Sequence, residues 1–339
     1  MKRTVVSLVI LSLALVPANA RRFAEGPVRL TVWPVKAPES ADKVRLLPKA
    51  DDLTDADAVP LYEEAVQAMP RGIKQDQIRE WLKLPPEQLP QQQAEEMVQK
   101  YLESLKLVVQ ATKCKQCNWP DWKPGAEVAN LNEYRELAFV LQLWARLEIS
   151  RGGYDGALLA MQAGFAMARQ LGEGPTIMQG LVGIAVAAMM CREVEYFVQA
   201  KDAPNLNAAL ANLPEPFVDM EKAIEKERAN LKDYNFLIRG QLEEQLDPAH
   251  DRTRLISKRL TNNLNGLQCV EAIRHYAATH DGQLPEALSD ISDVEVPNDL
   301  MSGKPFQYRR TADGAEVQST IPEGGGPEDT IHYAIVVKK

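Results

Sequence analysis

The segment from residue 131 to residue 199 constrains the fold of this chain more than any other. Its apolar residues recur every three to four positions, and this period predicts amphipathic α-helices over 131–150, 154–171 and 176–199. Glycines interrupt the pattern at Gly152 and Gly172, so the connecting loops are short. Long helices joined by short loops lie antiparallel as neighbours. The segment therefore predicts an antiparallel helical bundle or a repeat-like helical stack.

One part of this segment has the spacing of a helical repeat. Ala145, Gly152, Tyr154 and Ala157 fall at offsets that resemble a tetratricopeptide unit, in which small residues allow close helix packing. No second copy follows at the expected period, so we expect repeat-like geometry without a repeat array. Periodicity elsewhere predicts helices over about 60–70, 76–84, 91–113, 217–246 and 252–279.

The period changes near the C-terminus. Alternating apolar residues predict strands over 306–310, 316–321 and 331–337, with a turn at Asp313-Gly314. The last strand would be an aggregation hazard as a bare edge, so we expect it to be paired or covered. The fold class predicted from the whole chain is mainly α, with a small C-terminal antiparallel β-sheet.

The N-terminus has the three parts of a secretory signal peptide. Lys2 and Arg3 precede an apolar stretch, which ends at Pro17 and is followed by small residues up to Ala20. The stretch is shorter than the roughly 20 residues that a membrane-spanning helix needs, so we expect cleavage after Ala20 and a periplasmic or extracellular protein. We expect a signal peptide over 1–20, an extended proline-rich arm over 21–53, a helical domain over 54–280 and a small α+β tail over 281–339 that packs on it.

Charge and hydropathy narrow the choice of partners. The chain has 39 Lys and Arg against 47 Asp and Glu, for a formal net charge of −8, and the two signs are interleaved. Without a concentrated basic block, we expect no nucleic-acid partner. The apolar run over 177–190 is too short for a span and suits a buried central helix, so we expect no membrane span after signal cleavage.

Four cysteines in an exported chain permit disulfides, and Cys114 and Cys117 are the close pair. Structural cysteines, free or bridged, are the favoured interpretation, and this pair is the disulfide candidate. A redox-active pair usually opens a helix, where the dipole stabilises a thiolate, whereas this pair follows a predicted helix. A zinc site would need further ligands at matching spacing, which the sequence does not offer.

A search for catalytic chemistry finds no specific motif, so we assign no catalytic residue, no metal ligand and no cofactor. Acidic pairs such as Glu63-Glu64 are interpreted as solvated surface, because adjacent helical residues diverge by about 100°. The loop with Trp119, Asp121 and Trp122 is the candidate ligand or partner surface. Burial of this loop against the helices is the alternative that we favour.

Several short stretches resemble an uncharacterised family of exported helical proteins of planctomycete-type bacteria. Asn118 departs from the aspartate expected at its position in that family. The stretches are Leu46-Leu47-Pro48, Asp57 to Tyr62, Cys117-Asn118-Trp119, Arg135-Glu136-Leu137-Ala138 and Trp144-Ala145-Arg146.

The C-terminal part resembles the tail of type II secretion pseudopilins. The residues that carry this resemblance include Tyr276, Gly282, Asp299 and Tyr308. The resemblance implies a helix that leads into a small sheet, sometimes with a calcium-binding loop, although the prepilin cleavage motif is missing.

The leading functional hypothesis is a non-enzymatic helical scaffold that contacts an envelope protein or peptide. The alternatives are an exported hydrolase or carbohydrate-acting enzyme that uses carboxylates, and a thiol-redox factor that uses Cys114 and Cys117. Two facing acids in a cleft would favour the hydrolase, and a depressed thiol pKa would favour the redox factor.

Overall fold

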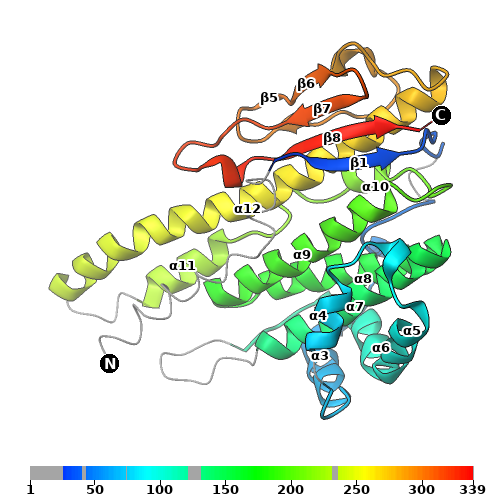
Figure 1. Ribbon diagram of the computed structural model, residues 1–339. Coiled ribbons are helices and arrows are strands. Elements are labelled where there is room, and N and C mark those ends of the chain that lie inside the picture. Colours follow the sequence, from blue (N-terminus) through cyan, green and yellow to red (C-terminus); the bar gives the residue numbers. More distant parts are fainter. Residues whose placement is uncertain (1–25, 40–42, 74, 121–130, 231–235, 339) are drawn as a thin grey trace.

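The computed structural model is mainly helical and is organised in layers (Figure 1). It describes residues 26–39, 43–73, 75–120, 131–230 and 236–338, with the side chains of 230 and 236–245 excepted. A small sheet covers one side of the long C-terminal helix, the central helices lie on the other side of that helix, and the N-terminal helices lie beyond them. The predicted fold class is confirmed, whereas the signal peptide lies outside the described residues.

The central helices have the predicted arrangement. They are α7 (Leu131–Arg151), α8 (Tyr154–Gly172) and α9 (Ile177–Phe197). The turn between α7 and α8 depends on Gly152, whose φ of +72° favours glycine. Thr176 caps α9 by accepting a hydrogen bond from the backbone N–H of Gln179. Each end therefore falls within a few residues of the end predicted from the apolar period and the glycine breaks.

Helices α8 and α9 pack closely because small residues line their contact. A Cβ added to Gly183 of α9 would lie 2.5 Å from the carbonyl oxygen of Ala168 in α8. Helix α9 is the one described helix that is long and apolar enough to cross a membrane, and 67% of its most apolar window is buried. It contacts α7, α8 and α12, so the prediction of a buried central helix is confirmed.

The N-terminal helices are shorter than predicted. The helix expected over 91–113 is divided at Tyr101 into two, because α5 packs on α7 while α6 packs on α3. The apolar period continues through Tyr101, so periodicity alone does not reveal the break. The helices here are α3 (Ala58–Gln67), α4 (Asp76–Trp81), α5 (Gln91–Lys100) and α6 (Leu102–Ala111), with 3₁₀ turns at Ala50–Asp52 and Pro86–Gln88.

The C-terminal helices differ from the prediction at Pro248. The expected break near this proline is absent, and α12 (Phe236–Thr279) continues through it, whereas α11 (Glu221–Asn230) is shorter than predicted. A proline removes one helical hydrogen bond, and this cost is outweighed where the rest of the helix is well packed. C-terminal to Pro248, α12 packs on α9, on the short helix α10 (Asn207–Ala211) and on the sheet.

The sheet unites the two ends of the chain. Its order is β1 (Val28–Val32), β8 (His332–Val337), β7 (Ala315–Gln318) and β6 (Gln307–Arg310). The β6, β7 and β8 strands are antiparallel as predicted, and β1 adds a fourth strand parallel to β8. The last strand is therefore paired on both sides, which confirms the expectation that it is not a bare edge.

Strand β1 shows where part of the predicted arm lies. Leu30 and Val32 of β1 are fully buried, and one hydrophobic cluster includes them together with the central helices and Tyr333 of β8. The other strands form two short pairs. Strand β2 (Thr54–Asp57) lies parallel to β3 (Cys114–Gln116), and β4 (Asn298–Asp299) lies antiparallel to β5 (Lys304–Pro305). The C-terminal part also has 3₁₀ turns at Leu288–Asp290 and Pro327–Asp329.

Two buried arginines tie loops to the helices. Arg146 of α7 forms an ion pair with Glu193 of α9, and both side chains are 0% exposed. The same guanidinium donates to the carbonyl oxygens of Leu82 and Leu84, at 2.9 and 2.6 Å, and so fixes the segment after α4. Arg274 of α12 likewise fixes the N-terminal arm. It forms an ion pair with the buried Glu271 and donates a hydrogen bond to the carbonyl oxygen of Trp33.

Asp299 braces the turn between β4 and β5. Its carboxylate accepts hydrogen bonds from Asn262, Ser302 and the backbone N–H groups of Met301 and Thr320. Burial tends to raise the pKa of Asp299, and these hydrogen bonds outweigh burial and lower it. The carboxylate therefore has a structural role in the tail.

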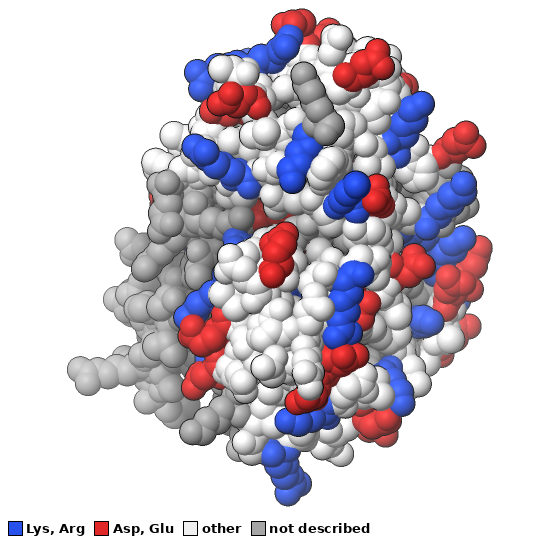
Figure 2. Space-filling model, turned by 45° about the vertical axis from the view of Figure 1, so that its right-hand side comes forward, with Lys and Arg blue, Asp and Glu red and all other residues white. Residues whose placement is uncertain are grey.

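Charged side chains are interleaved on the surface. Figure 2 shows Lys and Arg mixed with Asp and Glu over one face of the molecule, without a large patch of either sign. This pattern agrees with the alternation of signs along the sequence.

Candidate functional site

The loop around Trp119 lies against the helices. Trp119 is half-buried, and its ring stacks on Tyr62 of α3 with centroids 6.2 Å apart. The ring also meets Tyr134 of α7 edge to face at 5.6 Å. Trp119 therefore joins a three-ring aromatic cluster, while Asp121 and Trp122, which we predicted to share its surface, lie outside the described residues.

Gln170 of α8 holds this loop in place. Its side chain accepts a hydrogen bond from the Tyr62 hydroxyl and donates to the carbonyl oxygens of Ala111 and Cys114. Its backbone carbonyl accepts a 2.7 Å hydrogen bond from the indole N–H of Trp119. One residue thus connects α3, the end of α6 and the tryptophan loop to α8.

Asp57 also holds the loop around Trp119. Its carboxylate caps α3 through the N–H of Val59 and accepts hydrogen bonds from the backbone and the side chain of Asn118. The backbone hydrogen bond from Asn118 is the main cause of the lowered pKa of Asp57. Two stretches that carry the family resemblance therefore meet here, one from Asp57 to Tyr62 and the other around Asn118.

The two candidate disulfide cysteines are separate free thiols in this structure. The Cys114 thiol donates to the carbonyl oxygen of Gln110, and the Cys117 thiol donates to that of Gln170. Burial raises the pKa of both thiols, and more strongly that of Cys117. Both cysteines follow α6, in and just after strand β3, and neither is at a helix N-terminus that would stabilise a thiolate. The bridge between them stays a prediction for the oxidised protein.

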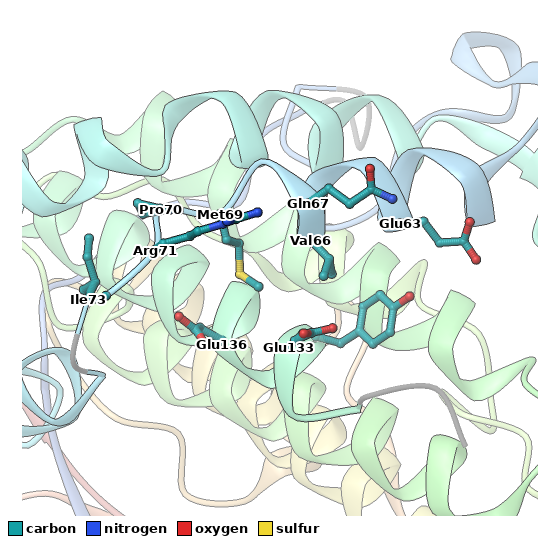
Figure 3. A pocket seen from close by; sticks show the side chains of 11 residues that line it. Glu63, Val66, Gln67, Met69, Pro70, Arg71, Ile73, Glu133 and Glu136 are labelled. Atoms are coloured by element: carbon teal, nitrogen blue, oxygen red, sulfur yellow. The ribbon is translucent and has the colours of Figure 1, made fainter. Parts of the chain in front are cut away.

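An open cleft lies beside the aromatic cluster, between α3 with its following loop and the first turns of α7. Its volume is about 690 Å³. Figure 3 shows Glu63, Val66 and Gln67 on α3, Glu133 and Glu136 on α7, and Met69 between the two walls. The lining comprises Glu63, Val66, Gln67, Met69, Pro70, Arg71, Gly72, Ile73, Glu133, Tyr134 and Glu136.

Glu136 is anchored at one end of the cleft. It accepts a 3.0 Å hydrogen bond from the Tyr101 hydroxyl and another from the side-chain amide of Gln75. Burial raises the pKa of Tyr101, and the Glu136 charge adds to the effect. Tyr101, the residue between α5 and α6, therefore helps to fix a carboxylate of the cleft.

Sequence reasoning identified Trp119 but not the cleft beside it. The sequence predicts that Glu63 is solvated surface, and its side chain is exposed, yet it faces a cleft whose other wall comes from α7. Glu133 and Glu136 stand three residues apart, a spacing that places both on one helix face. That spacing was the available signal, whereas the approach of α3 to α7 depends on tertiary packing.

Comparison of the chain with models of protein families, with characterised proteins and with solved structures finds no match. The two family resemblances therefore stay predictions, and the site is interpreted from its own geometry.

Proposed function

We propose that this protein is an exported, non-enzymatic helical scaffold that binds a protein or peptide of the cell envelope through the cleft between α3 and α7. The observation that carries the proposal is the cleft itself, which is open and has both acidic and apolar side chains in its lining. Open grooves on helical proteins suit peptide segments, which can extend along them.

The rigid surroundings of the cleft support this proposal. Tyr134 belongs both to its lining and to the aromatic cluster, and Glu136 is held by Tyr101 and Gln75. A site built on packed helices keeps its shape in the absence of ligand, which reduces the ordering cost of binding. The signal peptide predicted over 1–20 supports the envelope as the place of action.

The other two functional hypotheses make different demands on the structure. Thiol-redox chemistry requires an accessible thiol with a lowered pKa, and the raised pKa values of Cys114 and Cys117 speak against it. A carboxylate hydrolase could use the acids of the same cleft, and turnover by the wild-type protein would distinguish it from a binding protein.

The experiment is a pull-down of the protein from an envelope extract of its native cell, read by mass spectrometry. The comparison protein carries Glu63→Gln and Glu133→Gln, because removal of the tail would take away β4 to β8 and leave Leu30 of β1 without its sheet. We expect a reproducible partner that the double variant loses. No enriched partner with either protein, or hydrolysis of an envelope polymer by the wild type, would contradict the proposal.

A further inference from the structure

The cleft has carboxylates on both of its walls. Glu63 projects from α3, and Glu133 and Glu136 project from one face of α7, while Arg71 is the single basic residue of the lining. Among the described residues, none of these three glutamates forms an ion pair with a lysine or arginine. The cleft therefore has an excess of negative charge that the described part of the chain leaves uncompensated.

The hydroxyl of Tyr134 is a second polar group of the cleft that is available to a ligand. The Tyr134 side chain lines the cleft, and the residue is only 5% exposed, yet its hydroxyl makes no hydrogen bond to any described residue. Its oxygen remains open to solvent, so the hydroxyl can donate a hydrogen bond to an acceptor on a ligand. Burial, with smaller contributions from Glu63 and Glu133, raises the pKa of Tyr134 to about 12, so the hydroxyl keeps its proton at neutral pH.

Apolar side chains complete the lining. Val66 and Met69 lie between the acidic walls (Figure 3), and Ile73 lies near the far end. Lysine and arginine carry a cationic head on a long aliphatic stem, which packs on apolar surface while the head reaches a charge. A metal ion is a poorer match, because no group of three or more His, Cys, Asp or Glu side chains in the described part of the chain is gathered closely enough to hold one.

We infer that the cleft binds an extended cationic peptide segment, with a lysine or arginine held between Glu63 and Glu133 and a backbone carbonyl of the segment accepting from the Tyr134 hydroxyl. This inference rests on the proposed function and names the chemistry of the partner. Charge complementarity from two walls selects a cationic chain over a neutral or acidic one.

The first test measures the binding of fluorescein-labelled hexalysine by fluorescence anisotropy at low ionic strength, with hexaglutamate as the reversed-charge probe. We expect Glu63→Gln and Glu133→Gln each to weaken hexalysine binding about threefold to fivefold, and the double variant to weaken it at least tenfold. Glu64→Gln is the matched control, since Glu64 is an exposed neighbour on α3 outside the cleft lining. We expect this control to bind like the wild type.

A second variant tests the hydroxyl. Tyr134→Phe should weaken hexalysine binding about threefold or more without lowering the thermal midpoint, because the hydroxyl has no hydrogen bond to lose in the free protein. A purely structural role for the hydroxyl would instead lower the midpoint and leave affinity unchanged. That result would overturn its part in the inference.

The outcomes separate this inference from the proposed function. Failure of the wild type to bind hexalysine, or equal losses in Glu64→Gln and Glu63→Gln, would overturn the cationic-segment inference. If the envelope partner were still captured in that case, and lost on changing the cleft, the proposed function would stand with a different ligand chemistry. If no partner were captured, the proposed function itself would fail.

Discussion

The ion pair of Arg146 and Glu193 is fully buried in the helical body, so the fold should be sensitive to its loss. Replacing arginine by methionine keeps most of the side-chain volume but removes the charge. In Arg146→Met, Glu193 would remain 0% exposed without its cation, and the carbonyl oxygens of Leu82 and Leu84 would lose their donor. Breaking a buried pair by removing one partner typically costs about 3–5 kcal/mol. We expect Arg146→Met to lower the free energy of unfolding by about 4 kcal/mol.

The double variant Arg146→Met with Glu193→Leu separates the charge from the packing. With both charges removed, no uncompensated ion is left in the interior. The main cost is then the lost hydrogen bonding of the Leu82 and Leu84 carbonyls and of the buried Gln142 amide, which donates to Glu193. At about 1 kcal/mol for each lost hydrogen bond, the double variant should lose about 3 kcal/mol. The cost of the double variant would then be well below the sum of the two single costs.

The assay is equilibrium urea unfolding followed by far-ultraviolet circular dichroism. The matched control is Arg151→Met, which breaks the partly exposed pair of Arg151 and Glu95 near the end of the same helix. Such pairs contribute at most about 1 kcal/mol, so this variant should remain close to the wild type. A cost of Arg146→Met no greater than that of Arg151→Met, or single costs that simply add in the double variant, would contradict this prediction.

Three further predictions concern other parts of the chain. Because the pKa of Asp299 is lower in the folded state than in the unfolded state, its carboxylate stabilises the fold above about pH 4, and this stabilisation is lost as the pH falls through the folded pKa. Asp299→Asn should therefore lower stability at pH 7 and flatten the acid slope of the thermal midpoint, and an unchanged slope would refute this role. With their raised pKa values, Cys114 and Cys117 should react with iodoacetamide far more slowly in the folded protein at pH 8 than after unfolding, as mass spectrometry would show; equal rates would contradict their burial. Gly183→Ala should cost about 1–3 kcal/mol in urea unfolding, because its Cβ would meet the Ala168 carbonyl, and a neutral effect would show that α8 and α9 do not pack this closely.

The central helices could be predicted because local signals coincide there. The apolar period and the glycine breaks indicate the same boundaries, and α7, α8 and α9 follow them. Pro248 shows the limit of such rules, since packing along α12 outweighs the local cost of a proline.

Long-range pairing could not be predicted from local signals. The sequence predicts an extended arm over 21–53, but nothing in that segment specifies that β1 pairs in parallel with β8, about 300 residues later. The cleft is similar, because Glu63 and Glu133 belong to segments whose approach is fixed by the aromatic cluster of Tyr62, Trp119 and Tyr134. The sequence indicated which residues pack inward, but not which distant surfaces come together.

Site-specific photo-crosslinking in the cell that produces the protein would show whether the cleft binds a partner there. A photoreactive amino acid in place of Gln67, which is exposed and lines the cleft, should form a covalent adduct with another polypeptide. The same amino acid in place of Gln92, exposed on α5 outside the cleft lining, should form none. Equal adducts at both positions, or no adduct at Gln67, would contradict the claim that the cleft binds a partner.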